Sequence, residues 1–357
     1  MGYQIVVLPG DGIGPDVTAA AVTVLQRVLE EQTIEINWQT HLLGGRAIDE
    51  YGTPFPKETE NAVKQADAVL LGAVGGPKWD VGPGHLRPEA GLLALRRTLG
   101  VYANIRPVKA FKELVEASPL RTEIAQGVDV VIVRELTGGA YFGKRERGSD
   151  AQGARFAYDT MYYTESEIRR VLQTAFETAR LRRKKLTSVD KANVLDSSRL
   201  WREVVQEMSA GYPDVEVEHV LVDSCAMHLV TRPQTFDVLV TENLFGDILS
   251  DEAAVLTGSI GMLPSASIGQ GIGLYEPIHG SAPDIAGKGI ANPLGAILSA
   301  ALLLRYSLQL DVAANRVEEA VARALRAGAR TKDLARAGDE VVTTDQMTER
   351  VLSYLSL

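Results

Sequence analysis

The feature that most constrains the fold of this chain is the alternation of short strand-like runs with longer segments of helical period. The strand-like runs occupy residues 5–8, 68–71, 128–133, 185–189, 215–222 and 236–240, and helical segments such as residues 17–30 lie between them. Strands that alternate with helices predict an α/β architecture. With 357 residues, of which 45% are hydrophobic, the chain is long enough for two domains or for one large α/β domain with a substantial core.

Charged residues follow several of these runs. Arg134, Lys191 and Asp223 come at or just after the end of a run, and Asp247 lies in the helical segment that follows residues 236–240. In open α/β sheets, ligands bind beyond the carboxyl ends of the strands. These side chains are therefore better candidates for a functional site than charged residues in the middle of helices.

The first run leads into a glycine-rich turn, residues 10–15, of sequence GDGIGP. A dinucleotide-binding Rossmann fingerprint requires Gly-x-Gly-x-x-Gly, whereas Pro15 occupies the last position here, and no acidic residue clearly ends a second strand about 20 residues further on. The sequence therefore argues against a Rossmann domain. The glycines would still let the backbone approach a ligand closely, because they carry no Cβ.

Composition excludes several classes of protein. Lys and Arg number 37 against 46 Asp and Glu, and the net charge of −9 argues against a general surface for nucleic acid or anionic membranes. Cys225 is the only cysteine, and the N-terminal residues show no signal-peptide pattern, so we expect a cytoplasmic protein. The most apolar stretch, residues 297–304, is shorter than the roughly 20 residues of a membrane helix.

Two aspartates have the spacing of a cation site. Asp247 and Asp251 lie four residues apart, and on a helix this spacing places both on one face. Hard divalent cations bind carboxylate oxygens, and Asp223 is a candidate third ligand. The alternative is that Asp247 and Asp251 belong to a solvated acidic helix face.

Basic and phenolic residues add further candidates. Arg96, Arg106 and Arg134 could bind the carboxylates of a polyanionic substrate through their planar guanidinium groups, or each could be a surface residue. Lys191 at a strand end could act as a base, or be a solvated lysine. Tyr141 could donate a proton, or be a packed aromatic residue.

The remaining patterns concern the C-terminal region and one segment near the middle of the chain. Residues 304–328 and 345–355 are typical of helices at the surface of a C-terminal region. Residues 148–163 are aromatic and rich in turn formers, which is typical of an extended arm or hairpin; an ordinary surface loop is the alternative.

Three motifs carry a resemblance to a known family. They are LPGDGIGP at residues 8–15, NLFGDILSDE at residues 243–252 and IHGSAPDIA at residues 278–286. Together they show that the chain resembles the isocitrate/isopropylmalate dehydrogenase family of metal-dependent β-decarboxylating dehydrogenases. The resemblance covers nearly the whole chain, and no residue that the family uses departs from its pattern.

The resemblance implies an α/β fold of two domains with a central cleft that is not a Rossmann fold. The first domain would be discontinuous and bind the cofactor, with residues 1–101 and 258–357. The second domain, residues 102–257, would carry the dimer interface, the arm and the metal and substrate residues.

It also implies an activity, which is the oxidative decarboxylation of (2R,3S)-3-isopropylmalate to 4-methyl-2-oxopentanoate and CO₂ in leucine biosynthesis. Mg²⁺ or Mn²⁺ would bind to Asp223, Asp247 and Asp251, Lys191 would accept the hydroxyl proton, and Tyr141 would assist protonation of the enol. The working unit would be a homodimer in which the partner subunit supplies Lys191 and Asp223. Substrate-binding residues would be Glu89, Leu92, Leu93, Arg96, Arg106, Arg134, Val194 and Asp223.

The cofactor implied by the resemblance is NAD. A carboxylate at Asp284 would bond the ribose hydroxyls and repel a 2′-phosphate, which disfavours NADP. The adenosine side would lie along residues 261–269, 279–284 and Asn292. The full set of expected cofactor residues is Ile13, Gly75, Gly76, Pro77, Glu276, His279, Gly280, Ser281, Ala282, Pro283, Asp284, Ile285 and Asn292.

The resemblance implies that substrate choice depends on Leu92 and Leu93, which precede Arg96 in the same helical segment. Apolar side chains there suit an isopropyl group, whereas similar enzymes that act on isocitrate carry Ser and Asn in this stretch. The alternatives are a relative that acts on isocitrate, homoisocitrate, tartrate or 3-methylmalate, a non-catalytic regulatory subunit, and a metal-dependent lyase without redox chemistry.

Overall fold

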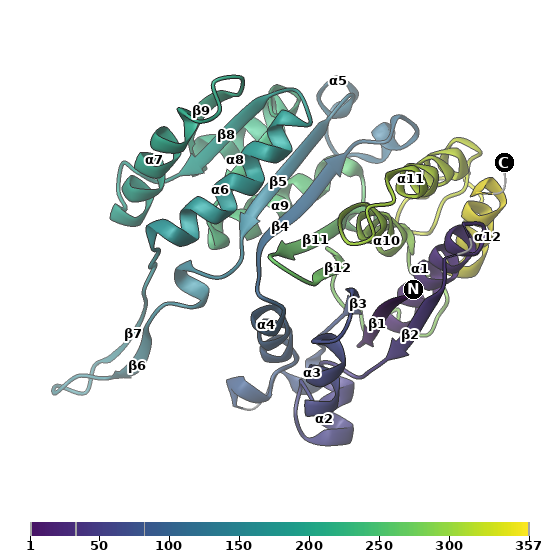
Figure 1. Ribbon diagram of the computed structural model, residues 1–357, viewed down its shortest axis with the longest axis horizontal. Coiled ribbons are helices and arrows are strands. Elements are labelled where there is room, and N and C mark those ends of the chain that lie inside the picture. Colours follow the sequence, from purple (N-terminus) through teal and green to yellow (C-terminus); the bar gives the residue numbers. More distant parts are fainter. Residues whose placement is uncertain (1, 33, 82, 356–357) are drawn as a thin grey trace. The chain divides into compact units, whose positions relative to one another are not determined.

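The computed structural model describes residues 2–32, 34–81 and 83–355, and the chain divides into two compact units (Figure 1). Unit 1 comprises Met1–Val101, Ala110–Gln126 and Ala254–Leu357, and unit 2 comprises Tyr102–Lys109 and Gly127–Ala253. The sequence-based boundaries placed residues 110–126 and 254–257 with the second domain, but these residues pack in unit 1. The side chains of Arg330 and Arg336 hold residues 110–126 in this unit, because they bond to backbone oxygens of Glu113 and Glu116.

The strands of unit 1 lie in the order β2-β1-β3-β12-β11. Their bounds are Tyr3–Gly10 for β1, Ile36–Thr40 for β2, Ala68–Ala73 for β3, Pro264–Gly269 for β11 and Gly273–Pro277 for β12. All pairs are parallel except β11–β12. Every residue of β3 is buried, as expected for a central parallel strand with both faces covered.

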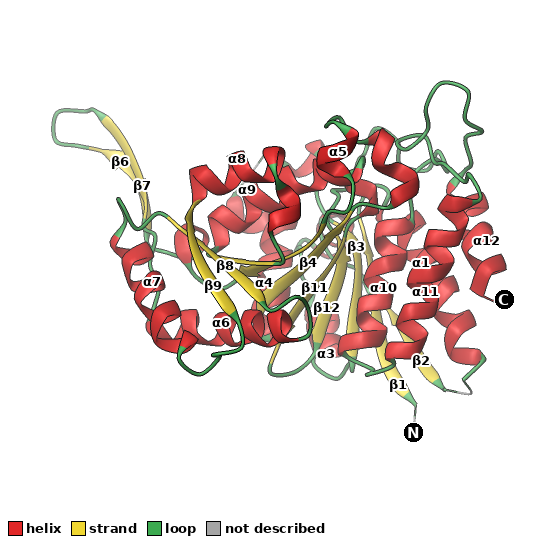
Figure 2. Cartoon of the chain, turned by 90° about the horizontal axis from the view of Figure 1, so that it is seen from above, coloured by secondary structure: helices red, strands yellow, loops and turns green. Residues whose placement is uncertain are grey.

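Helices α1 (Gly14–Glu30), α10 (Leu294–Tyr306), α11 (Asp311–Arg326) and α12 (Thr344–Leu355) form one layer in unit 1 (Figure 2). The shorter helices of this unit are α2 (Gly45–Tyr51), α3 (Lys57–Val63), α4 (Pro88–Leu99) and α5 (Thr122–Ala125). The layer begins at the glycine-rich turn, since α1 starts at Gly14 with a proline in its first turn, where a missing N–H costs nothing.

Helix α10 corrects one expectation from the sequence. Residues 304–328 were predicted as surface helix, but a turn at residues 307–310 separates α10 from α11, and Gln309 has a left-handed φ of 56°. Residues 294–304 are buried on all sides, against α1, α11, β11 and β12. The most apolar stretch of the chain is thus a core helix, and among the described residues no helix is long and apolar enough to cross a membrane.

The strands of unit 2 lie in the order β4-β5-β10-β8-β9. Their bounds are Val101–Lys109 for β4, Asp129–Glu135 for β5, Lys185–Asp190 for β8, Glu216–Leu221 for β9 and Val238–Thr241 for β10. Strand β4 is antiparallel to β5, and β5, β10, β8 and β9 are mutually parallel. The helices are α6 (Glu165–Arg180), α7 (Asp196–Ser209), α8 (Val222–Thr231) and α9 (Asn243–Ala254).

A two-stranded hairpin extends from unit 2, as the sequence predicted for an arm (Figure 1). Strand β6 (Arg145–Ser149) pairs antiparallel with β7 (Arg155–Asp159), and every residue of β7 is exposed. The hairpin begins a few residues earlier than the expected range of 148–163. Helix α6 follows it and opens with a capping box in which Thr164 and Glu167 bond to each other's backbone N–H. The α/β class is confirmed.

The burial of α10 leads to a stability prediction. Leu303→Ala removes a side chain that is fully buried, so we expect the free energy of unfolding to fall by about 2–5 kcal/mol. The matched control is Leu181→Ala, at a position that is 89% exposed. This substitution should change the free energy of unfolding by less than about 0.5 kcal/mol. Urea unfolding at one fixed protein concentration measures both, and equal effects would contradict the core position of α10.

Candidate active site

The parallel strands of unit 2 bring several predicted residues to one edge of the sheet. Arg134 is the next-to-last residue of β5, and Lys191 follows directly after β8. Asp223 is the second residue of α8, which follows β9. Helix α9, which carries Asp247, follows β10. Because the carboxyl ends of parallel strands meet at the same edge, this is where a ligand site is expected in an open α/β sheet.

Arg134 and Asp247 form the centre of this group. The Arg134 side chain is only 5% exposed, its Nε donates to Asn243 Oδ1 over 3.0 Å, and its Nη1 bonds to the Asp247 carboxylate. The Tyr141 hydroxyl donates to the other oxygen of Asp247. Burial alone would raise the pKa of Asp247, but Arg134, Tyr141 and then Arg106 outweigh it, so that pKa lies below its usual value. Asp247 is therefore an anion held in a fixed position.

Arg106 supports the same helix from strand β4. Its side chain is 8% exposed, and it donates to Asn104 Oδ1 and to Ser250 Oγ, both over 2.6 Å. A longer contact of 3.5 Å reaches Asp251. Burial raises the pKa of Asp251, Arg106 opposes this, and the neighbouring Asp247 adds to it. Two buried guanidinium groups thus lie close to two carboxylates of α9.

Asp247 and Asp251 lie on one face of α9, as their spacing predicted, and Asp251 is 61% exposed at its side chain. The third predicted ligand, Asp223, does not join them. It accepts a hydrogen bond of 2.6 Å from Lys191 Nζ, which holds the pKa of the Asp223 carboxyl below its usual value. Within residues 2–32, 34–81 and 83–355 of one chain, no group of three His, Cys, Asp or Glu side chains could hold a metal ion.

A buried tyrosine that the sequence reasoning missed fixes the start of α9. The Tyr163 hydroxyl accepts from the Asn243 N–H over 3.0 Å and donates to Glu242 Oε2 over 3.1 Å. The Glu242 carboxylate also accepts the N–H groups of Leu244 and Phe245 in the first turn of the helix. Burial raises the pKa of Glu242. No sequence motif distinguishes Tyr163, since its partners lie about 80 residues away.

The loop that carries Tyr141 packs against the same tyrosine. A side chain at Gly138 would approach the Tyr163 ring to 2.4 Å, so the loop comes closer there than any larger residue allows. The Asn243 amide also donates to the Gly138 carbonyl over 3.2 Å. Burial, followed by the hydrogen bond to Asp247, raises the pKa of Tyr141. Tyr141 is thus a protonated donor. Its hydroxyl is held by Asp247, and its loop is held at Gly138 by Tyr163 and Asn243.

Arg96 lies in unit 1 and has a different partner from the other two arginines. Its Nη2 bonds to Glu276 Oε1 over 2.7 Å, and both side chains are largely buried. Leu92 and Leu93 are half-buried, whereas Leu95 of the same helix is fully buried, so the first two are not ordinary core leucines. The expected substrate residue Val194 is in unit 2, is 61% exposed, and donates its N–H to the Lys191 carbonyl over 3.0 Å.

Two of the predicted cofactor residues of unit 1, from different loops, are joined by a hydrogen bond. Ile13 N–H donates to the Ser281 carbonyl over 2.8 Å, and Gly75 lies beside Glu89, because a Cβ there would be 3.0 Å from its carboxylate. In the described part of the chain, Nε2 of His279 is buried without a hydrogen-bond partner, and the Nδ1 atom is 2.9 Å from the Gly280 carbonyl. Asp284 is exposed.

The other expected cofactor residues fall near these. Gly76 has a φ of 159° and precedes a short 3-10 turn that begins at Pro77. Ala282 has a positive φ of 38°, which is uncommon for a residue with a side chain. Ile285 N–H bonds back to the Ala282 carbonyl, and Pro283 is exposed. The Asn292 side chain already has partners within the protein, because its amide group donates to Asp333 and its oxygen accepts the Leu294 N–H.

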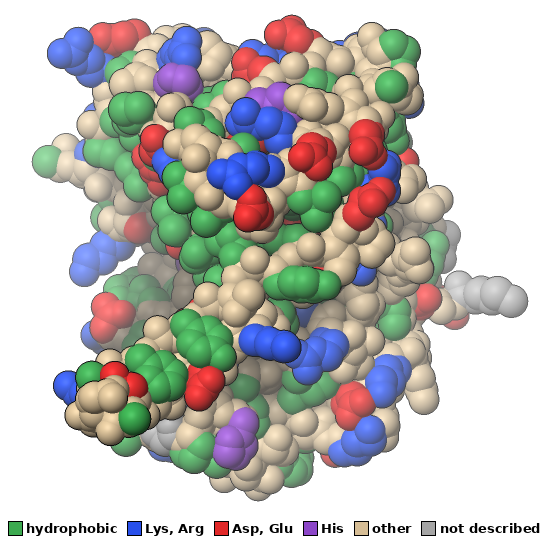
Figure 3. Space-filling model, turned by 90° about the vertical axis from the view of Figure 1, so that its left-hand side faces the viewer, with side chains coloured by type: hydrophobic (Ala, Val, Ile, Leu, Met, Phe, Trp, Pro, Cys, Tyr) green, Lys and Arg blue, Asp and Glu red, His purple; other side chains and the backbone are tan. Residues whose placement is uncertain are grey.

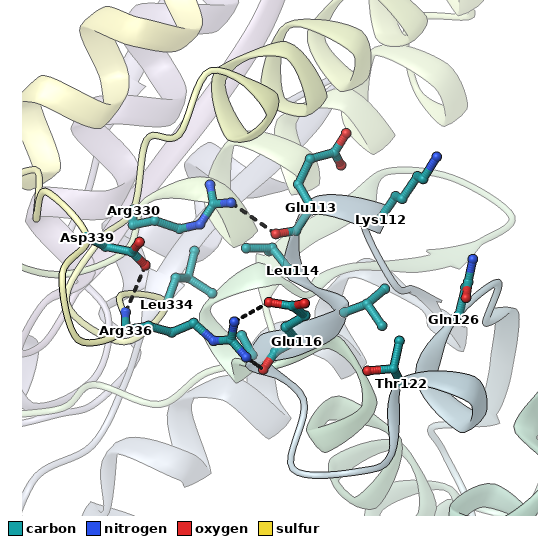
Figure 4. Close-up of a pocket in the computed structure, with 12 residues that line it drawn as sticks. Lys112, Glu113, Leu114, Glu116, Thr122, Gln126, Arg330, Leu334, Arg336 and Asp339 are labelled. Carbon is teal, nitrogen blue, oxygen red and sulfur yellow. Dashed lines mark hydrogen bonds and ion pairs between the residues drawn. The ribbon is translucent and has the colours of Figure 1, made fainter.

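A hollow of about 360 Å³ in unit 1 is not part of this group (Figure 4). It lies between residues 112–126 and 330–339, and none of the expected site residues lines it. Its arginines are already bonded, Arg330 to the Glu113 carbonyl and Arg336 to the Glu116 carboxylate (Figure 4). These two arginines therefore join the segments on either side of the hollow, and neither guanidinium group is free to bind an anion.

Comparison with known proteins identifies the family. The model of the isocitrate/isopropylmalate dehydrogenase family matches residues 4–351. The 3-isopropylmalate dehydrogenases of Bacillus licheniformis and Aquifex aeolicus are 58% and 54% identical to the chain, over 100% and 99% of its length and 96% and 97% of theirs. The crystal structure of an isocitrate dehydrogenase from Methylococcus capsulatus is similar, with a TM-score of 0.88, 37% identity and coverage of 99% of this chain and 100% of that one.

The chain therefore belongs to the isocitrate/isopropylmalate dehydrogenase family, as the three sequence motifs indicated. It is an enzyme of the dehydrogenase class. A further similar structure is a β-decarboxylating dehydrogenase of Thermococcus kodakarensis, with a TM-score of 0.81, 38% identity and coverage of 99% of this chain and 96% of that one.

Tyr163 provides a test of the network behind Asp247. Tyr163→Phe leaves the Asn243 N–H and the Glu242 carboxylate each short of one buried partner, so we expect the free energy of unfolding to fall by about 1–3 kcal/mol. Tyr158→Phe is the matched control, since that hydroxyl bonds to Glu146 on the exposed hairpin. If urea unfolding shows the two variants to be equally stable, the hydroxyl of Tyr163 does not hold the start of α9.

Proposed function

We propose that this chain catalyses the NAD-dependent oxidative decarboxylation of (2R,3S)-3-isopropylmalate to 4-methyl-2-oxopentanoate and CO₂, a step of leucine biosynthesis in the cytoplasm. The observation that carries the proposal is the pair of buried guanidinium groups, Arg106 and Arg134, beside the α9 carboxylates and the Tyr141 hydroxyl. Buried arginines next to an exposed carboxylate suit a substrate that is itself a dicarboxylate chelated to a cation. The names of the relatives support the same substrate.

The α9 carboxylates fit a divalent cation. Asp247 is ionised and fixed by Arg134, while Asp251 is exposed enough for its oxygens to reach a ligand. Two carboxylates from one chain supply fewer oxygens than Mg²⁺ or Mn²⁺ requires, so the substrate and the Asp223 carboxylate of a partner subunit would complete the set. When bound, the cation supplies Lewis acidity toward the substrate oxygens.

The loops of unit 1 fit NAD. The unpartnered Nε2 of His279 lies in the loop that also presents the exposed carboxylate of Asp284. A free imidazole nitrogen and a carboxylate suit the base and the ribose hydroxyls of an adenosine, and the carboxylate repels the 2′-phosphate of NADP. The nicotinamide of NAD⁺ is the hydride acceptor that the oxidation requires.

The chain's own residues would manage the protons and charges. Arg96, Arg106 and Arg134 would bind the substrate carboxylates and orient the substrate. Lys191 would take the proton of the substrate hydroxyl as a neutral amine. It must therefore first leave its ion pair with Asp223 and release its own proton to solvent, because an ammonium ion cannot accept a proton. Tyr141 is held as a protonated phenol by burial and by Asp247 and would deliver a proton to the product carbon.

Substrate identity gives the first test. Because Leu92 and Leu93 are apolar and half-buried, an isopropyl group fits beside them and the additional carboxylate of isocitrate does not. We expect NADH formation from 3-isopropylmalate with Mn²⁺ to exceed that from isocitrate by at least about 100-fold in kcat/KM. Excess EDTA should abolish NADH formation from 3-isopropylmalate, and restoring Mn²⁺ should recover it.

Each alternative function predicts a different result in this assay. Faster turnover of isocitrate would favour the alternative that the chain acts on isocitrate, as the name of the similar isocitrate dehydrogenase from Methylococcus capsulatus suggests. CO₂ release without NADH would indicate a lyase. Inactivity on every 2-hydroxy acid tested would favour a regulatory subunit, and full activity in EDTA would remove the cation from the proposal.

We further propose that the active unit is a homodimer. Exposed apolar side chains occur on α8, at Met227 and Val230, and on α9, at Ile248, which is 59% exposed. Aromatic residues are also exposed on the hairpin at Phe156 and Tyr158. Viewed from the side of the hairpin, the surface shows hydrophobic side chains gathered between charged ones (Figure 3). Apolar surface of this kind marks a protein–protein interface.

A shared site predicts complementation between inactive variants. Lys191→Ala and Asp247→Ala homodimers should both be nearly inactive, since each lesion affects both sites. In a mixed dimer, the chain with Lys191→Ala keeps its own Asp247 and receives an intact Lys191 from its partner, so one site is whole. Unfolding and reassembling the two variants together should therefore restore activity.

The control is the wild type taken through the same reassembly, which measures the yield of active dimer. Mass spectrometry should confirm that mixed dimers have formed. If mixed dimers form and remain inactive, each chain builds its own site, and Lys191 acts within the chain that carries it.

A further inference from the structure

The glycine-rich turn that fails the Rossmann fingerprint contains a fully buried carboxylate, Asp11, whose exposed fraction is 0%. Its Oδ2 accepts the backbone N–H groups of Gly45 over 2.7 Å and Gly75 over 2.9 Å, and its Oδ1 accepts that of Arg46 over 2.8 Å. Its own N–H donates to the Ala73 carbonyl over 2.7 Å. One side chain thus ties together segments that are 34 and 64 residues away in the sequence.

One of these bonds comes from backbone in a conformation that favours glycine. Gly75 has a φ of 110°, in the region that side chains rarely adopt, and its N–H points at the Asp11 carboxylate. A Cβ at Gly44, which precedes Gly45, would come within 2.5 Å of Asp11 Oδ2. The carboxylate is therefore enclosed by backbone, and it accepts the N–H group of the Gly75 loop together with two N–H groups from the first turn of α2.

The same turn holds the other cofactor loop. Two residues after Asp11, the Ile13 N–H donates to the Ser281 carbonyl over 2.8 Å, within the loop that presents His279 and Asp284. The loop of Gly75 and Gly76 and the loop of residues 279–284 are thus fixed from one short segment, residues 10–14 of the chain.

We infer that Asp11 is a positioning residue for the cofactor: its carboxylate holds the Gly75 loop in its binding conformation before NAD arrives. This inference rests on the proposed function, because it takes Gly75 to be a cofactor residue. The physical reason is preorganisation, since a loop that is already fixed loses less conformational freedom on binding.

The direct test is NADH binding by Asp11→Asn, followed by fluorescence titration, which needs no turnover. An amide keeps one acceptor oxygen, so its NH₂ group must face either the Arg46 N–H or the N–H groups of Gly45 and Gly75. In either orientation the Gly75 N–H loses its charged acceptor, because a neutral amide forms weaker hydrogen bonds than a carboxylate. We expect the dissociation constant of NADH to rise about tenfold, the effect of losing a hydrogen bond to a charged group.

The matched control is Asp237→Asn. Asp237 is a buried carboxylate of unit 2 that also accepts backbone N–H groups, from Arg183 over 2.8 Å and from Lys185 over 3.5 Å. It should lower stability without changing NADH affinity. Steady-state kinetics add a second readout, because Asp11→Asn should raise KM for NAD much more than KM for the second substrate, whereas a general loss of folded protein lowers kcat alone.

The wild type provides a measurement that does not depend on the variant folding. Hydrogen–deuterium exchange of the peptide that spans Gly75 should be slow in the cofactor-free protein and change little when NADH is added. Rapid exchange that NADH alone suppresses would overturn the inference, because the loop would then be ordered by the cofactor and not by Asp11.

The outcomes separate the two proposals. If the wild type does not bind NADH, the proposed function fails, and the inference fails with it. If the wild type binds NADH and Asp11→Asn binds it equally well, only the positioning role of Asp11 is overturned.

Discussion

The burial of Arg106 and Arg134 beside Asp247 is the constraint on which the rest of unit 2 depends. An uncompensated buried charge is strongly destabilising, so two guanidinium groups at 8% and 5% exposure need anions and acceptors close by. Helix α9 supplies them through its first turns, and antiparallel pairing of β4 with β5 places Asn104 opposite Arg134. The orientation of α9, and with it the position of Asp251, follows from this requirement.

The sequence predicted those parts of the site that have a local cause. The spacing of Asp247 and Asp251 places them on one face of a helix, and Arg134 and Lys191 could be located because each lies at the end of a strand-like run or just after it. The partners could not be predicted, because they depend on packing between distant segments. Arg96 and Glu276 pair across 180 residues, and the break before α11 depends on how α10 is buried.

The two units contribute different chemistry to the proposed reaction. Unit 2 contains fixed charges, with an ionised Asp247 and a protonated Tyr141, which suit the binding of an anionic substrate and the delivery of a proton. Unit 1 contains loop backbone held by the Asp11 carboxylate and a His279 side chain whose Nε2 atom has no partner among the described residues, which suit a cofactor recognised largely by loop backbone. Asp223 accepts a hydrogen bond from Lys191 and does not join the α9 aspartates. Under the proposed function, a single chain would therefore present an incomplete cation site, and a second chain would supply the missing ligand.

Anomalous diffraction from crystals grown with Mn²⁺ and 3-isopropylmalate tests this account most directly, because the manganese signal identifies the ligands without reference to activity. The account predicts one manganese peak per chain, bound by Asp247 and Asp251 of that chain, by Asp223 of the partner subunit and by the substrate. Manganese held entirely by residues of one chain, or located away from α9, would contradict it.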